Sequence, residues 1–308
     1  MSNLPNAIFL MGPTASGKTG VAVDLVQSLP VEIISVDSAL VYRDMNIGTA
    51  KPDAVTLAKA PHHLVDIISP TEAYSAAAFR KDALHWMADI TARGKIPLLV
   101  GGTMLYFKAL KEGLNDLPVA DPTIRAELDA LIEHHGAPYL HTLLKKIDEE
   151  TALRLSPNDT QRIGRAMEIY RITGKPMSAL LKRENKRDLP YCIQSIALIP
   201  SDRSTLHQRI ATRFKQMLEQ GLVDELHKLR EKYILHPDMP SMRCVGYRQA
   251  WQYMEGKISQ TQLIDQGIAA TRQLAKRQLT WLRSMPKNVE IDCLADQLTQ
   301  RVRLALKL

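Results

Sequence analysis

The chain contains little cysteine. Its 308 residues include only Cys192, Cys244 and Cys293, which are widely spaced and odd in number. No CxxC pair and no HExxH pattern occurs, so neither a structural nor a catalytic zinc site is expected. We expect reduced, buried thiols in a reducing compartment. A chain of this length buries enough apolar surface to fold without disulfide or metal staples.

Long hydrophobic runs are also absent. The apolar stretch Ala7–Met11 ends at Gly12 after five residues, and no basic segment precedes it. A membrane span needs about 20 apolar residues, and a signal peptide needs a basic segment followed by a longer apolar one. We therefore expect a buried strand here, no membrane partner and a cytoplasmic location.

Positive charge is in mild excess. Lysine and arginine number 40 against 33 aspartates and glutamates, which gives a net charge of +7. The 45% of hydrophobic and 24% of charged residues are typical of a globular chain and not of a disordered one. Many basic proteins bind no polyanion, so the distribution of the charge along the chain is more informative than its sum.

Short apolar runs recur along the first hundred residues. Runs of this kind, without strict alternation, suit a parallel sheet that is buried on both faces. Helical spacing at Lys18–Ser28 and Ser75–Arg93 separates them. The alternation predicts an α/β fold with a doubly wound core. The expected strands are Ala7–Met11, Val31–Val36, His63–Ile67 and Ile96–Val100.

The segment from residue 118 to 190 has a different pattern. It begins with a turn-rich stretch and then contains no strand-like run, until a fifth strand is expected at Gln194–Ile199. We therefore predict a P-loop α/β core formed by residues 1–117 and 191–308, with an all-helical insertion at residues 118–190. Only helices are expected after the fifth strand, at Asp202–Gln220, Val223–Lys232, Tyr247–Met254 and Ser259–Leu282.

The first expected strand leads into a phosphate-binding motif. The segment fits G-x-x-x-x-G-K-[ST] at every fixed position and lies between a strand and a helix, as this P-loop motif requires. Backbone N–H groups and the helix N-terminus would surround phosphate oxygens, the lysine would reach the outer phosphate, and the last hydroxyl would ligate Mg²⁺. The motif is typical of nucleotide-binding and ATP-binding proteins, but it does not specify the phosphate. Its residues are Gly12, Pro13, Thr14, Ala15, Ser16, Gly17, Lys18 and Thr19.

A carboxylate is missing where many P-loop enzymes need one. They hold Mg²⁺ with an acid that ends an apolar strand, but the fourth strand here ends in Gly101-Gly102-Thr103. The clear carboxylate is instead Asp37, directly after the second strand. Because ligands bind at the carboxyl ends of parallel strands, we expect Asp37, Thr103 and the P-loop to converge. The arrangement places a carboxylate well for a general base, but it lacks the acidic residue that a hydrolase of this class would need.

Basic residues gather in two places. Residues 162–187 hold eight cations against two acids, and residues 268–285 hold four cations and no acid. On helices these would form either solvated faces or stripes that follow a phosphate backbone. The passage Arg243–Arg248 mixes cations, an aromatic ring and a glycine, which suits either packing or the clamping of an unpaired base. The clusters are Arg162, Arg165, Arg171, Lys175, Lys182, Arg183, Lys186 and Arg187, and Arg272, Lys276, Arg277 and Arg283.

Six segments taken together resemble the bacterial tRNA dimethylallyltransferase family. The combination is far more specific than the P-loop alone, and the resemblance extends from the P-loop to about Arg283. It implies transfer of a dimethylallyl group from dimethylallyl diphosphate to N6 of the adenosine just 3′ of the tRNA anticodon. The segments are Gly12–Thr19, Asp37–Leu40, Asn46–Pro52, Gly101–Tyr106, Arg243–Arg248 and Thr271–Gln278.

The resemblance also implies roles for particular residues. The P-loop would hold the diphosphate of an isoprenoid donor with Mg²⁺, Asp37 matches the general base, and Arg213 matches a cation that faces the diphosphate. A monomer is the simplest expectation for the oligomeric state, which the resemblance leaves open. Contacts with the tRNA anticodon stem-loop would come from Thr103, Arg125 and four stretches. These stretches are Asp37, Ser38, Ala39 and Leu40; Gln161, Arg162, Ile163, Gly164 and Arg165; Met242, Arg243, Cys244, Val245, Gly246 and Tyr247; and Ala275, Lys276, Arg277, Gln278, Leu279, Thr280, Trp281 and Leu282.

Three other functions remain open from the sequence. A P-loop small-molecule kinase would consume ATP and use Asp37 to activate a hydroxyl, but it leaves the basic clusters unexplained. An isopentenyltransferase acting on free adenine nucleotides would use the same P-loop and base without needing two cationic clusters. A nucleic-acid-binding module regulated through its P-loop would keep its function without Asp37.

Overall fold

The computed structural model describes residues 4–115, 117–182, 189–285 and 288–307. The chain divides into two compact units. We call Met1–Lys111 together with Leu189–Leu308 the core unit, and Glu112–Asp188 the helical unit. The sequence placed the insertion at residues 118–190, whereas the helical unit begins where α4 (Met104–Glu112) ends.

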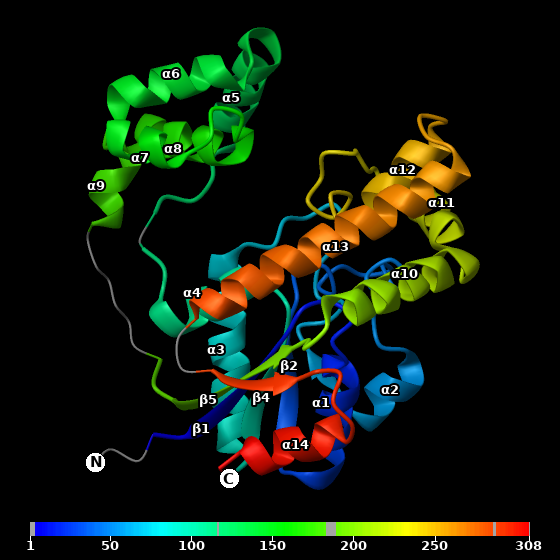
Figure 1. The fold of residues 1–308 in the computed structure, drawn as a ribbon. Helices are drawn as coiled ribbons and strands as arrows, with labels where there is room; N and C mark the ends of the chain where they lie inside the picture. Colours follow the sequence, from blue (N-terminus) through cyan, green and yellow to red (C-terminus); the bar gives the residue numbers. More distant parts are fainter. Residues whose placement is uncertain (1–3, 116, 183–188, 286–287, 308) are drawn as a thin grey trace. The chain divides into compact units, whose positions relative to one another are not determined.

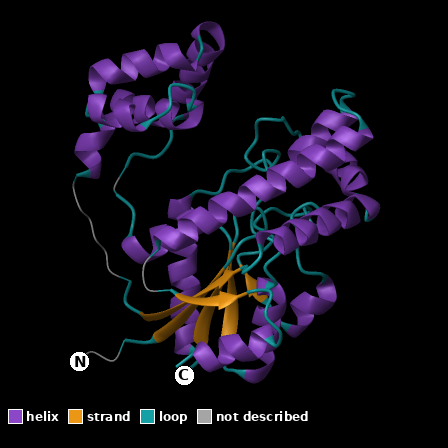
Figure 2. Cartoon of the chain, in the orientation of Figure 1, coloured by secondary structure: helices purple, strands orange, loops and turns teal. Residues whose placement is uncertain are grey.

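One six-stranded sheet forms the centre of the core unit (Figure 2). Its strands have the order β3-β2-β4-β1-β5-β6, and every neighbouring pair is parallel. This confirms the predicted α/β fold with a parallel sheet. The strands are β1 (Asn6–Met11), β2 (Val31–Val36), β3 (His62–His63), β4 (Ile96–Gly101), β5 (Cys192–Ile199) and β6 (Val289–Asp292).

Two expectations about the strands are wrong. The strand expected at His63–Ile67 is only two residues long, because Leu64 and Asp66 have left-handed backbone angles (φ of 65° and 57°) that turn the chain out of the sheet. The region after the fifth strand is also not wholly helical, since β6 adds a parallel edge strand beside β5. With four half-buried or exposed residues, β6 has no apolar run that would reveal it.

Helices cover both faces of the sheet, as the alternation of side chains on β1 shows. Phe9 and Met11 pack among α3, α4, α10 and α13, whereas Ile8 and Leu10 pack against α1 and α14. A strand buried on both faces explains why the run Ala7–Met11 contains no polar residue. The bounds are α1 (Lys18–Ser28), α2 (Ala54–Lys59), α3 (Ala76–Ala92), α10 (Arg203–Glu219), α11 (Leu222–Lys232), α12 (Tyr247–Met254), α13 (Gln260–Ser284) and α14 (Leu298–Ala305).

The helices α10 to α13 enclose the loop that follows β2. Figure 1 shows these four helices grouped beside one end of the sheet. Val41, Tyr42 and Met45 of the loop are buried in one apolar cluster with Leu222 and Trp251 of the helices. The loop after Asp37 is therefore part of a packed core. No helix among the described residues is long and apolar enough to cross a membrane.

The helical unit has its own apolar core. Leu128, Leu140, Leu144 and Ile163 are buried together in it. Aspartates cap three of its helices by accepting hydrogen bonds from first-turn N–H groups, which satisfies donors that the helix leaves unpaired. The helices are α5 (Pro122–His135), α6 (Ala137–Ile147), α7 (Glu149–Arg154), α8 (Thr160–Thr173) and α9 (Met177–Leu181).

A fully buried carboxylate, Glu168, joins three segments of this unit. Its Oε1 accepts hydrogen bonds from the Asp121 N–H group and from Arg125 Nε, both at 2.9 Å. Its Oε2 accepts from Arg165 Nη1 at 2.5 Å, and Arg165 Nη2 donates to the Pro118 carbonyl at 2.5 Å. Burial opposes ionisation of Glu168, but the hydrogen bonds from Arg165 and Arg125 outweigh it and hold its pKa below the usual value. The helical unit is thus organised around a charge network.

Replacing Glu168 by glutamine should weaken the helical unit. Hydrogen bonds to charged groups contribute about 1.5–3 kcal/mol each, so we expect the free energy of unfolding to fall by about 1–3 kcal/mol at pH 7. The folded pKa lies below the unfolded value near about 4.3, so the stabilisation is present above that pH and is lost as the pH falls through the folded pKa. Native-state amide hydrogen exchange of α5 and α8 at pH 7 and at about pH 3 would measure both effects.

The matched control is Glu133→Gln, because Glu133 lies exposed on α5. It should leave the exchange rates of α5 and α8 unchanged. Equal protection in the wild type and the Glu168→Gln variant at pH 7 would contradict the assigned network.

Candidate active site

The P-loop connects β1 to α1 with an unusual backbone. Ala15 has a left-handed φ of 62° although it is not glycine, and Gly17 follows with φ of 82°. Left-handed residues in such a loop are typical of backbone nests that bind anions, and strain of this kind gathers at functional sites. Gly17 lies at the N-cap of α1 and offers no side chain to cap it, and the first turn carries no acid. The positive end of α1 is therefore open to an anion.

Lys18 folds back over this loop. Its Nζ donates hydrogen bonds to the Pro13 carbonyl at 2.7 Å and to Ser16 Oγ at 3.4 Å. Burial lowers the pKa of Lys18 to about 8, an effect that Asp37 opposes and Arg213 reinforces. These electrostatic effects place Lys18, Asp37 and Arg213 in one neighbourhood.

Arg213 brings a second cation from α10. Burial lowers the pKa of its guanidinium, and Asp37 acts in the opposite direction. Its side chain has no hydrogen bond or ion pair with any residue in the described part of the chain. A partly buried guanidinium without a partner gains most from an anionic ligand.

Asp37 begins the loop that follows β2. Its Oδ1 accepts hydrogen bonds from the N–H groups of Ala39 at 2.8 Å and Leu40 at 3.4 Å. Its Oδ2 accepts none from the residues that the structure describes. One oxygen thus fixes the orientation of the carboxylate, and the other is available to accept a proton.

The sheet register brings Thr103 next to Asp37. Gly101 of β4 pairs with both Met11 of β1 and Val36 of β2. The three residues that follow this row are Gly12 of the P-loop, Asp37 and Gly102. Thr103 Oγ1 accepts a hydrogen bond from the Ser38 N–H group at 3.1 Å. The structure therefore brings together the residues that we expected to converge.

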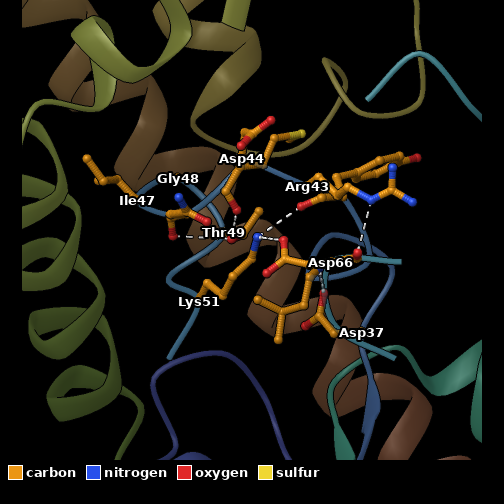
Figure 3. A network of polar contacts seen from close by, with 12 residues as sticks. Asp37, Arg43, Asp44, Ile47, Gly48, Thr49, Lys51 and Asp66 are labelled. Carbon is orange, nitrogen blue, oxygen red and sulfur yellow. Dashed lines mark hydrogen bonds and ion pairs between the residues drawn. The ribbon is translucent and has the colours of Figure 1, made fainter. Parts of the chain in front are cut away.

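A polar network holds the loop from Asp37 to Lys51 (Figure 3). The Lys51 side chain is only 4% exposed; its Nζ donates to the Tyr42 carbonyl at 2.9 Å and pairs with Asp66. Arg43 Nη2 donates to the Ile67 carbonyl at 2.9 Å. These contacts fasten the loop after β2 to the turn after β3.

Glu225 of α11 anchors the same loop from the other side. Its carboxylate accepts hydrogen bonds from the N–H groups of Asn46 (2.9 Å), Ile47 (2.8 Å) and Gly48 (3.2 Å), and from the Tyr247 hydroxyl at 2.5 Å. A Cβ on Gly48 would lie 2.5 Å from the Tyr247 ring. Glu225 belongs to no sequence motif and was therefore not predicted; the segment Asn46–Pro52, whose backbone it binds, was the available signal.

The stretch Ala275–Leu282, expected to contact tRNA, is divided by the fold. Lys276, Arg277 and Trp281 are exposed on α13, and Lys108 Nζ lies 5.9 Å from the centre of the Trp281 ring. Gln278 instead accepts a hydrogen bond from the Thr14 N–H group and donates one to the Gly102 carbonyl. Thr280 is exposed with the cations, whereas Ala275, Leu279 and Leu282 are buried in the core.

The stretch Met242–Tyr247 is divided in the same way. Met242 and Tyr247 are buried, whereas Arg243 is exposed and lies 3.6 Å from Asp238. Cys244 lies near Asp37, and burial together with that charge raises the pKa of its thiol to about 12. Arg243 is therefore the cation of this stretch that is accessible at the surface. Val245 is half-buried, and Gly246 is buried with a left-handed φ of 95°.

The two basic clusters differ in how many of their cations form ion pairs with acidic side chains in the folded protein. In the helical unit Arg162, Arg171 and Lys182 pair with Asp159, Glu127 and Glu150. Gln161 is exposed, Gly164 is half-buried and Ile163 is buried, while Arg125 and Arg165 bind Glu168. The cations Arg183, Lys186 and Arg187 lie outside the described residues. On α13, by contrast, Arg272, Lys276, Arg277 and Arg283 form no ion pair within the described ranges.

A magnesium ion would have few protein ligands at this site. The described residues contain no group of three or more histidine, cysteine, aspartate or glutamate side chains that could hold a metal. Thr19 is exposed in the first turn of α1. Because Mg²⁺ commonly binds through substrate phosphates and water with few protein ligands, the site fits an ion that is shared with a bound diphosphate.

Comparison with known proteins identifies the family. The sequence model of the IPP transferase family matches residues 40–285. The tRNA dimethylallyltransferase of Thiobacillus denitrificans is 62% identical over 97% of this chain and 95% of its own length. That of Methylobacillus flagellatus is 60% identical over 98% and 96%. The chain belongs to the tRNA dimethylallyltransferase family.

Solved structures of the family share the fold. The tRNA isopentenylpyrophosphate transferase of Bacillus halodurans has a TM-score of 0.71 and 37% identity, covering 97% of this chain and 94% of its own. A eukaryotic dimethylallyltransferase acting on tRNA has a TM-score of 0.77 and 26% identity, covering 97% and 78%. The tRNA dimethylallyltransferase resemblance and the predicted prenyltransferase class are confirmed, and the family assignment disfavours the kinase and the pure binding module.

Protonation of Lys18 should be coupled to anion binding. Its pKa of about 8 leaves roughly half of the side chains neutral at pH 8. A bound diphosphate favours the charged form, so binding should take up about half a proton per site at pH 8 and little at pH 6. The affinity of the protein for diphosphate should therefore fall as the pH rises through about 8, the pKa of Lys18.

Isothermal titration with inorganic diphosphate, in two buffers that differ in ionisation enthalpy, would measure this uptake. The Lys18→Met variant corrects for protons that the ligand itself gains or loses. The same uptake in both proteins would show that Lys18 is not the titrating group.

Proposed function

We propose that this enzyme transfers the dimethylallyl group of dimethylallyl diphosphate to N6 of the adenosine just 3′ of the tRNA anticodon and releases diphosphate. The observation that carries the proposal is that Asp37, which directly follows the aligned end of β2, interacts electrostatically with Lys18 at the start of α1 and with Arg213 of α10. This arrangement combines two cations for an anionic leaving group with a carboxylate that has one free oxygen. It includes no acid at the end of β4 to activate water.

The P-loop side of the site would hold the donor. The N–H groups at the start of α1, Lys18 and Arg213 would bind the diphosphate and stabilise the charge that develops as the C–O bond breaks. Thr19 would share Mg²⁺ with the diphosphate. The ion, when bound, would neutralise charge on the leaving group.

The side of β2 and β4 would hold the acceptor. The exocyclic amine of adenine is a poor nucleophile because its lone pair is delocalised into the ring. As N6 bonds to the allylic carbon and diphosphate departs, Asp37 Oδ2 would take the proton that N6 loses, a role that typically contributes ~10²–10⁴-fold. Thr103, fixed by Ser38, would orient the base. The adenine must leave the anticodon-loop stack, at a cost of a few kcal/mol.

Binding of tRNA would offset that cost. The exposed cations of α13 are suited to phosphate contacts because they form no ion pair within the described residues. Arg243 would add a contact, although it forms an exposed ion pair with Asp238 at 3.6 Å. In the helical unit Arg125 and the stretch Gln161–Arg165 would add further contacts. We propose that the enzyme acts as a monomer in the cytoplasm.

A transfer assay tests the proposal directly. Radiolabelled dimethylallyl diphosphate is incubated with Mg²⁺ and either unmodified tRNA or free AMP, beside reactions that contain only ATP. Label in tRNA and none in AMP is the expected result. Label in AMP would indicate an isopentenyltransferase of free nucleotides, and consumption of ATP without any label transfer would revive the kinase.

The Asp37→Asn variant tests the general base. Asparagine keeps an oxygen that can accept from the Ala39 and Leu40 N–H groups, but it cannot take a proton. We expect kcat to fall by ~10²–10⁴-fold while the Kd for tRNA changes by no more than a few-fold. Single-turnover rates and filter binding measure the two quantities. An unchanged rate would exclude Asp37 as the base.

The double variant Lys276→Gln with Arg277→Gln tests the cations of α13. Each lost phosphate contact removes about 0.7–0.9 from the slope of log K against log salt, so the slope should flatten by up to ~2. The double variant Lys215→Gln with Lys228→Gln removes the same charge from exposed positions on α10 and α11. It should leave the slope unchanged. Equal slopes in both double variants would mean that the α13 cations do not contact phosphate.

A further inference from the structure

One side chain of α13 connects two loops of the active site. Gln278 is half-buried, and its Oε1 accepts a hydrogen bond from the Thr14 N–H group at 2.9 Å. Its Nε2 donates to the Gly102 carbonyl at 2.9 Å. The P-loop and the loop that carries Thr103 are thus held by the two ends of the same carboxamide.

The site is shaped for an amide side chain. An amide offers an acceptor and a donor side by side, as a backbone N–H and a carbonyl require, and an ionised carboxylate does not. A Cβ on Gly102 would lie 2.3 Å from Gln278 Nε2, so this glycine leaves the space that the carboxamide fills. Reversing the amide would place donor against donor at Thr14 and acceptor against acceptor at Gly102, which fixes its orientation.

The position of Gln278 differs from that of its neighbours. Lys276 and Arg277 are exposed, whereas Gln278 points inward from the same turn of α13. The Thr14 N–H group lies within the phosphate-binding motif, immediately before the strained residue Ala15. A hydrogen bond at this point restricts the loop where its backbone conformation costs free energy.

We propose that Gln278 is a positioning residue that holds the P-loop in its diphosphate-binding conformation and does not itself contact tRNA. The proposal rests on the function proposed above, since it names the diphosphate as the ligand that benefits. It assigns the two faces of α13 different tasks: exposed cations for tRNA, and an inward carboxamide for the donor site.

The Gln278→Met variant removes both hydrogen bonds and keeps a side chain of similar length. We expect the Kd for inorganic diphosphate with Mg²⁺ and the KM for dimethylallyl diphosphate to rise roughly tenfold, which corresponds to the loss of one or two hydrogen bonds. The Kd for tRNA should stay within about twofold of the wild type. Gln266→Met, at an exposed position of the same helix, is the matched control and should change none of these values.

The Gln278→Glu variant provides a second test that does not depend on packing. It retains an acceptor for the Thr14 N–H group but loses the donor to Gly102 and adds a negative charge beside the diphosphate. We expect it to weaken diphosphate binding at least as much as Gln278→Met, with tRNA binding again unchanged. Thermal unfolding of each variant confirms that the comparison is made between folded proteins.

The outcomes separate this proposal from the function on which it rests. Weaker diphosphate binding with unchanged tRNA binding supports the positioning role. Unchanged diphosphate binding in both variants, or a loss confined to tRNA binding, would overturn the role of Gln278 while leaving prenyl transfer intact. A wild-type protein that neither binds diphosphate nor transfers label would overturn the proposed function and this inference together.

Discussion

The register of three parallel strands is the constraint on which the site depends. Gly101 lies opposite both Met11 and Val36, so β1, β2 and β4 end in one row. A Cβ on Gly101 would lie 2.0 Å from the Val36 carbonyl, which makes glycine necessary for this approach. The anion-binding loop, the carboxylate and the threonine therefore occur together because each follows an aligned strand end.

The C-terminal helices turn these strand ends into a fixed site. Glu225 accepts hydrogen bonds from three consecutive backbone N–H groups in the loop after β2, and Lys51 connects the same loop to Asp66. Loops at the ends of sheets are usually the mobile part of an α/β protein. Here charged side chains provide hydrogen bonds that the loop backbone could not make with itself.

The cations of the two units differ in whether acidic side chains pair with them. In the helical unit, acids compensate several of the cations that cluster in the sequence, and Glu168 orients Arg125 and Arg165 from a buried position. The cations of α13 and Arg213 have no acid paired with them among the described residues. Cations without an acidic partner are the ones that can bind phosphate. Their positions therefore indicate a phosphate-binding surface better than the net charge of +7 does.

The sequence alone determined the α/β class, the P-loop, Asp37 and the boundaries of helices such as Lys18–Ser28 and Tyr247–Met254. These features can be read from neighbouring residues, because a helix or strand imposes a periodic pattern of apolar residues and the P-loop is a contiguous motif. Tertiary structure alone decided the turn at Leu64, the edge strand β6 and the inward position of Gln278. Thr14 and Gln278 are 264 residues apart in the sequence. Tertiary packing brings such residues together, and no pattern among neighbouring residues predicts the contact.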